Sequence, residues 1–176
     1  LGEAIESIYY YQLFNIIMKI YRDLDNLPII KNAVLTIGSY DGVHIGHQKI
    51  IKKINDLAKS IGGQSVLITF YPHPRLVVSS DSHNLRLLNT LEEKIVLLEQ
   101  YKIDVLVIVP FSLQFASQSP DEYIIDFLVA NFQPSIITIG YDHKFGKNRE
   151  GNISYLKKFE QEYKFKVVEI SKQEVA

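Results

Sequence analysis

The sequence contains no cysteine and no tryptophan, and its only methionine is Met18. Without cysteine the chain can form neither a disulfide nor a thiolate metal site, which is consistent with the cytoplasmic location that we expect. A surplus of positive charge is also missing, because the formal net charge is −1 and the pI is near 6.6. This balance argues against a dedicated nucleic-acid binder.

Long apolar runs are absent as well. The segment 8–20 is rich in Ile, Tyr, Leu and Phe, but Gln12, Asn15 and Lys19 interrupt it and it is too short to span a membrane. We therefore expect no membrane partner. The segment MKIYRDLDNLP, which begins at Met18, looks like the natural N-terminus of a protein. Residues 1–17 are therefore expected to be an extension of uncertain status, either a fragment artefact or an N-terminal helix. Residues 18–176 are expected to form one domain.

What the chain does contain is a regular alternation of short apolar runs with amphipathic segments. Capping boxes at Thr90 and Ser119, each followed three residues later by glutamate, mark the starts of two helices. The alternation predicts crossover units, and hence an α/β fold with a doubly wound, Rossmann-like parallel sheet of about five strands and flanking helices. The expected strands are 34–37, 65–71, 104–109, 135–140 and 165–170. The expected helices are 45–61, 120–131, 152–163 and one that begins after Thr90 and includes Ile95, Leu97 and Leu98.

Three loops with informative residues follow strands of this sheet: 38–47, 70–75 and 140–149. Ligands of such sheets gather outside the carboxyl ends of the strands. The first loop, within VLTIGSYDGVHIGHQ, leads from a strand into a helix, and backbone N–H groups at a helix start suit a phosphate group. Neither G-x-G-x-x-G nor G-x-x-x-x-G-K-[ST] occurs, so a dinucleotide dehydrogenase and a P-loop enzyme are disfavoured.

The first loop has His44 and His47 one helical turn apart, with Gly46 between them. Two other interpretations compete with a phosphate site. A zinc pair would need a third ligand, and no cysteine exists to supply it. The histidines could also act only as helix caps, although two glycines, an aspartate and two histidines in one turn exceed what capping requires.

At this point the chain resembles a known family. GSYDGVHIGH at 38–47 resembles the G-x-[FY]-D-G-[VF]-H-x-G-H signature of the nucleotidyltransferase superfamily. TFYPHP at 69–74 is similar to the F-x-P-H-P motif of the FMN adenylyltransferase domain of bacterial bifunctional riboflavin kinase/FAD synthetases. GYDHKFGKNR at 140–149 resembles the third motif of that family, G-x-[DN]-F-x-F-G. The resemblance extends from about Met18 to Ala176.

The resemblance implies a fold of the nucleotidyltransferase type and the reaction FMN + ATP → FAD + pyrophosphate, with Mg²⁺ accompanying ATP. It assigns roles to three groups of residues. The expected catalytic residues are His44, His47 and Asp41, with Asp41 orienting the turn or holding a magnesium water. The expected ATP-binding residues are Gly38, Ser39, Tyr40, Gly42 and Gly46. The expected flavin-binding residues are Phe70, Pro72, His73, Pro74, Asp142 and Phe145.

The chain departs from the family pattern at two places. His143 stands where the family commonly has Phe, which is expected to alter the contact to the flavin. The family motif I-S-S-T-x-I-R, which serves the ATP phosphates, and the riboflavin kinase domain do not occur within these residues, so a truncated piece of a longer protein is expected. Two alternatives stay open: a nucleotide- or flavin-binding fragment without catalysis, or a related small-molecule adenylyl- or cytidylyltransferase.

Phe115, Lys147 and Arg149 carry weaker expectations. Phe115 either lines the flavin pocket or packs under the helix that begins after Ser119. Lys147 and Arg149 either bind phosphate or are exposed surface charges.

Overall fold

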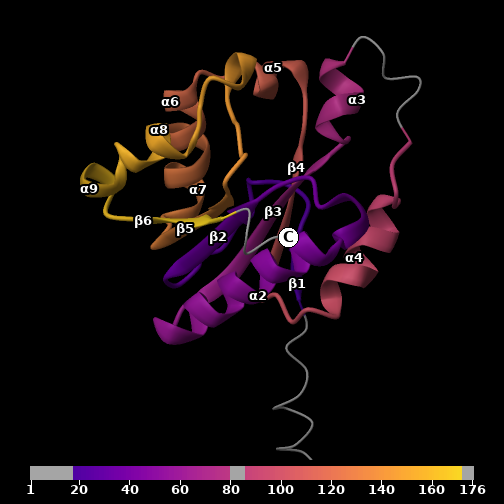
Figure 1. The fold of residues 1–176 in the computed structure, drawn as a ribbon, viewed down its shortest axis with the longest axis horizontal. Helices are drawn as coiled ribbons and strands as arrows, with labels where there is room; N and C mark the ends of the chain where they lie inside the picture. Colours follow the sequence, from indigo (N-terminus) through magenta and orange to yellow (C-terminus); the bar gives the residue numbers. More distant parts are fainter. Residues whose placement is uncertain (1–17, 80–85, 172–176) are drawn as a thin grey trace, which may run out of the picture.

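The computed structural model describes residues 18–79 and 86–171, so the interpretations of residues 1–17 lie outside the described residues. Its centre is a six-stranded, all-parallel sheet with the strand order β1-β4-β3-β2-β5-β6 (Figure 1). The strands are β1 (Lys19–Tyr21), β2 (Ala33–Ile37), β3 (Gln64–Tyr71), β4 (Val105–Pro110), β5 (Ile136–Gly140) and β6 (Lys166–Ile170).

The five expected strands are present, each within one residue of its predicted ends. The sheet has six strands rather than about five, because β1 adds an edge strand beside β4. Only three residues of β1 pair, and two of them are exposed, so no burial pattern marked this segment in the sequence. The central strands are buried on both faces: every residue of β2 and Val105–Val109 of β4 are inaccessible to solvent.

Helices cover both faces of the sheet (Figure 1). On one face lie α2 (Ile45–Ser60) and α4 (Leu91–Glu99), whose buried residues include Ile51, Ile54 and Leu98. The other face carries the helical segments that follow β4 and β5. These are α5 (Leu113–Ala116), α6 (Pro120–Glu122), the π-helical η3 (Tyr123–Val129), α7 (Ala130–Phe132), α8 (Ile153–Lys157) and α9 (Glu160–Tyr163).

Both predicted capping boxes are confirmed. The Thr90 hydroxyl accepts from the Glu93 N–H at 3.2 Å, and the Glu93 carboxylate accepts from the Thr90 N–H at 2.8 Å. Ser119 and Glu122 form the same pair of bonds at the start of α6. The helix that begins there continues to Phe132, but its middle is π-helical, which the sequence pattern did not predict.

Two other segments differ from expectation. The segment after Pro74 is not a loop at first but a short helix, α3 (Pro74–Val78), because His73 caps it and Pro74 occupies its first turn. The helix expected at 152–163 is divided into α8 and α9 by a turn at 158–159. Among residues 18–79 and 86–171, no helix has the length and apolar character needed to cross a bilayer.

The order of the sheet determines where a ligand can enter. From β2 the chain proceeds to β3 on one side, whereas β5 pairs with β2 on the other. The connections therefore diverge between β2 and β5, and in open α/β sheets this switch point leaves a crevice at the carboxyl ends of the strands. The loops that follow β2, β3 and β5 all lie at this carboxyl edge of the sheet.

Candidate active site

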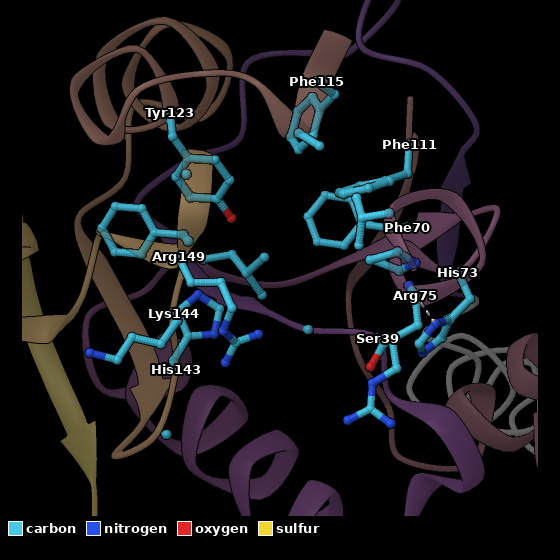
Figure 2. Close-up of a pocket in the computed structure, with 18 of the residues that line it drawn as sticks. Ser39, Phe70, His73, Arg75, Phe111, Phe115, Tyr123, His143, Lys144 and Arg149 are labelled. Atoms are coloured by element: carbon cyan, nitrogen blue, oxygen red, sulfur yellow. Dashed lines mark hydrogen bonds between the residues drawn. The ribbon is translucent and has the colours of Figure 1, made fainter. Parts of the chain in front are cut away.

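A cleft of about 650 Å³ lies at the carboxyl edge of β2, β3 and β5, with a size suited to a cofactor-sized ligand. Residues from all three predicted loops line it, together with residues from α5 and the π-helical turn (Figure 2). Nine residues expected to bind ATP or flavin, or to act in catalysis, line the cleft: Gly38, Ser39, Tyr40, His47, Phe70, His73, Pro74, Asp142 and Phe145. Five others are not among the lining residues: Asp41, Gly42, His44, Gly46 and Pro72.

One end of the cleft is aromatic. The rings of Phe111 and Phe115 lie 5.4 and 5.5 Å from the ring of Phe70, and the Tyr123 ring stacks on Phe145 at 4.9 Å (Figure 2). Phe115 lines the cleft and also packs against Phe127 of the following helix. A planar, largely apolar ring system is the kind of group that such a wall accepts.

The cleft is also rich in cations. Arg75, Lys144, Lys147 and Arg149 line it, against a single carboxylate, that of Asp142. Figure 2 shows Arg75 on one side and Lys144 with Arg149 on the other. Although the chain as a whole is nearly neutral, this arrangement makes the cleft locally attractive to an anion.

The start of α2 brings the two histidines of the first loop together. The His44 ring caps the helix by accepting from the His47 N–H at 3.4 Å, and the two rings stack at 3.7 Å. Burial, with a smaller contribution from the neighbouring charge of His44, lowers the pKa of His47 to about 4. His47 is therefore a neutral imidazole at pH 7, with one N–H to donate. Its buried Nδ1 has no hydrogen-bond partner.

The turn before α2 is held in place by Tyr40, Asp41 and Gly42. Tyr40 is buried, has a left-handed backbone (φ 49°), and its hydroxyl lies 2.7 Å from the Thr36 hydroxyl. The Asp41 carboxylate accepts from the N–H groups of Leu88, at 3.0 Å, and Asn89, at 3.3 Å. These contacts join the turn to residues 88–89. Gly42 has φ 73°, and a Cβ there would lie 2.6 Å from Leu88.

The second loop positions Arg75. The Tyr71–Pro72 peptide bond is cis. After it, the His73 imidazole accepts from the Arg75 N–H at 3.2 Å and begins α3. Burial lowers the pKa of His73, so this ring also favours its neutral, accepting form. Pro72, which the family resemblance assigns to flavin binding, is not among the residues that line the cleft.

The third loop folds back on itself around Phe145, which forms an antiparallel bridge with Gly151. Gly146 (φ 71°) leads to Lys147, whose N–H donates to the Gln118 carbonyl at 2.6 Å and so joins this loop to the start of α6. His143 is half-buried and lines the cleft. Its Nε2 is buried without a hydrogen-bond partner, and burial lowers the pKa of the ring to about 4.

Several cleft residues were not predicted. Arg75, Phe111, Tyr123 and Lys144 line the cleft, but each is an ordinary residue in its local pattern. Lys94 lies behind the cleft wall, buried on α4. Its position did carry a signal, because a lysine there interrupts the apolar stripe of Leu91, Ile95 and Leu98.

Comparisons with known proteins agree with this geometry. Residues 27–176 match the family model described as FAD synthetase. The chain is similar to proteins named bifunctional riboflavin kinase/FMN adenylyltransferase. That of Buchnera aphidicola subsp. Schizaphis graminum is 37% identical over 88% of this chain and 49% of the relative. That of Listeria monocytogenes is 34% identical over 82% and 46%, and that of Escherichia coli K12 is 31% identical over 85% and 48%.

The chain thus spans about half the length of these relatives. A crystal structure titled as a macrolide-efflux protein from Streptococcus pneumoniae has the same fold, with a TM-score of 0.75 over 89% of this chain and 52% of that one. Its 22% identity shows the fold alone. From the family match and the three ordered motifs at one edge of the sheet, we conclude that the chain belongs to the FAD synthetase family.

Proposed function

We propose that this chain is an FMN adenylyltransferase, which transfers the adenylyl group of ATP to FMN and releases pyrophosphate. The observation that carries the proposal is the composition of the cleft: an aromatic end and a cationic side meet at the start of α2, in a chain of the FAD synthetase family. FMN has an aromatic ring system and a phosphate, and ATP brings three more phosphates. One cleft can therefore receive both partners of the reaction.

In the reaction, a phosphate oxygen of FMN attacks the α-phosphorus of ATP. The bond between that phosphorus and the oxygen bridging to the β-phosphate breaks, and pyrophosphate leaves with the electron pair. A phosphate monoester has a second pKa of about 6, so the nucleophile is already largely a dianion at pH 7 and needs no strong base. The protein must mainly align the two phosphates and stabilise the charge that develops.

The described residues suit this task. His47, neutral at pH 7, has one N–H to offer to a phosphate oxygen, and the N-terminus of α2 adds partial positive charge. Arg75 and Arg149, on opposite sides of the cleft, can neutralise phosphate charge (Figure 2). His44, stacked on His47 and capping the helix, fixes the orientation of its neighbour.

Phe70, Phe115 and Phe145 would form the walls around the isoalloxazine ring, and Asp142 would accept from a polar edge of the ligand. The described residues contain no group of three or more His, Asp or Glu side chains that could hold a metal. A magnesium ion would therefore be carried mainly by the nucleotide phosphates, with Asp142 as the carboxylate that lines the cleft. When bound, magnesium would neutralise charge on the phosphates.

Two further parts of the proposal concern the whole protein and its location. A riboflavin kinase domain is proposed for the whole protein, because the relatives are named as bifunctional and the chain spans about half of their length. A cytoplasmic location is proposed because the sequence contains no cysteine.

The test is to incubate the protein with FMN and Mg-ATP and to follow FAD by chromatography, with this chain and with a longer chain that continues past Ala176. The His47→Ala variant should lower turnover by roughly 10²–10³, the effect of removing one preorganised donor. Lys52→Ala, on the exposed side of the same helix, is the matched control and should leave turnover unchanged. FAD from neither wild-type protein would reject the proposed function, and full turnover by the His47 variant would remove this residue from the mechanism.

A further inference from the structure

Lys94 is a lysine inside the protein. Only 6% of it is exposed, and it lies on α4 between the buried residues Leu91 and Leu98. Burying an ammonium group is unfavourable unless an opposite charge compensates for it. No carboxylate of the described residues lies within ion-pair distance of Lys94. The fold thus keeps a positive charge at this place without a direct counter-ion.

The position of this charge is fixed by the first loop. The Lys94 Nζ donates to the Ser39 carbonyl at 2.6 Å, and the Thr69 hydroxyl donates to the same oxygen at 3.2 Å. Ser39 itself lines the cleft. One carbonyl therefore joins α4 and β3 to the turn that precedes the two histidines, and the ammonium lies directly behind that turn.

The ionisable groups around Lys94 come from three elements. Asp41 belongs to η1 (Asp41–Val43), His47 to α2, and His73 caps α3. The charge of Lys94 contributes to the lowered pKa values of both histidines, behind the larger effect of burial. Burial lowers the pKa of Lys94 itself, and Asp41 opposes this effect. The Asp41 carboxylate, however, is already engaged by the N–H groups of Leu88 and Asn89.

We infer that Lys94 is a positioning residue: its buried positive charge, held against the Ser39 carbonyl, favours the binding of nucleotide phosphates at the start of α2. The inference rests on the proposed function, because it concerns the ATP side of the same cleft. Lys94 does not line the cleft, so it acts through the Ser39 turn and through its electric field, which a water-poor interior screens weakly. The aromatic end lies outside this arrangement, so binding of the flavin ring should not depend on it.

The main test compares Lys94→Met with Thr69→Val. Both variants remove one donor to the Ser39 carbonyl, but only the first removes a charge. We expect Lys94→Met to lower kcat/KM for Mg-ATP about tenfold or more, and Thr69→Val to lower it less than about threefold. Binding of riboflavin, which has no phosphate, should stay within about twofold of wild type in both variants. Equal losses in the two variants, or an unchanged kcat/KM in Lys94→Met, would overturn the inference.

Lys94→Gln separates the charge from the hydrogen bond, because the amide can still donate to the Ser39 carbonyl. It should lose as much kcat/KM for Mg-ATP as Lys94→Met, and recovery of wild-type activity would show that the charge is not needed. The dependence of kcat/KM on pH gives a further test, because a purely structural role of Lys94 would leave this dependence unchanged. Because Lys94 is charged only below its lowered pKa, kcat/KM for Mg-ATP should fall on the alkaline side at a pH below about 10.5. This fall should be absent in Lys94→Met.

Two further measurements separate a failure of the inference about Lys94 from a failure of the proposed function and from unfolding of the variants. If the wild-type protein makes no FAD, the proposed function fails, but the inference can still be tested by ATP affinity, which should be about tenfold weaker in Lys94→Met. If both Lys94 variants unfold, ATP affinity of the unaltered protein is measured from about pH 8 upward, where the ATP phosphates are already fully ionised. The affinity should weaken as Lys94 loses its proton, and constant affinity up to about pH 10.5 would contradict the inference.

Discussion

Replacing His143 with phenylalanine should remove much of the acid sensitivity of the folded protein. In the folded chain, burial lowers the pKa of His143 to about 4 from an ordinary value of 6.5. As the pH falls below 6.5, the unfolded chain therefore binds a proton that the folded chain does not accept. The stability that depends on a neutral His143 is complete above pH 6.5 and is lost as the pH falls toward 4.

The size of this effect follows from the two pKa values. At about 1.4 kcal/mol for each pH unit, the difference between 6.5 and about 4 amounts to about 3 kcal/mol in the free energy of unfolding. His47 has a similarly lowered pKa but is more exposed, so its contribution is reduced by solvent screening. His143→Phe should therefore lose about 3 kcal/mol less stability than wild type between pH 7 and pH 4.

The assay is urea unfolding of the ligand-free protein at several pH values from 7.5 to 4, followed by circular dichroism. Lys144→Phe is the matched control, because it adds a ring to the neighbouring exposed position and leaves His143 in place. At pH 7 the His143 variant should also be as stable as wild type or more stable, since it removes a buried nitrogen without a partner. The same loss of stability with falling pH in wild type and His143→Phe would refute the reasoning.

Two further predictions concern the turn and the cationic side of the cleft. Gly42→Ala should destabilise the fold by roughly 1–3 kcal/mol, because its φ of 73° is a left-handed conformation that alanine adopts only with strain. The exposed Leu88 side chain can move away from the new Cβ, so Gly62→Ala, with φ 60° and open space, should cost about as much. Thermal unfolding compares the two variants, and a Gly42 variant as stable as wild type would contradict the strain. Arg75→Met should weaken FMN binding about tenfold and leave riboflavin binding unchanged, because in the proposed function this guanidinium neutralises the FMN phosphate. Calorimetry measures both affinities, and equal losses for FMN and riboflavin would contradict this role.

The fold could be predicted largely because its signals are local. The apolar runs of β2 to β6 and the capping boxes at Thr90 and Ser119 are each complete within a few residues of sequence. β1 was not predicted, because only pairing with β4, far along the chain, makes it a strand. The π-helical turn at 123–129 was not predicted either, because its apolar pattern is the same as that of an ordinary helix.

The sequence predicted which loops form the candidate site, but it predicted fewer of the side chains that support and line it. The three loops could be placed together because parallel strands end at one edge of the sheet. The contacts that position the first loop are long-range: Asp41 binds the backbone at Leu88 and Asn89, and Lys94 binds Ser39. Such contacts leave no periodic pattern, so only the fold reveals which charged residues support the turn.

The most direct test of the central claim follows the phosphorus atoms of ATP. The protein, as this chain and as a chain continued past Ala176, is incubated with FMN, magnesium and ATP that is labelled at the α-phosphorus. The proposed function predicts that the label appears in FAD, that unlabelled pyrophosphate forms in equal amount, and that His47→Ala slows both. If, with both chains, the label stays in ATP or appears only in AMP, adenylyl transfer to FMN in this cleft is contradicted.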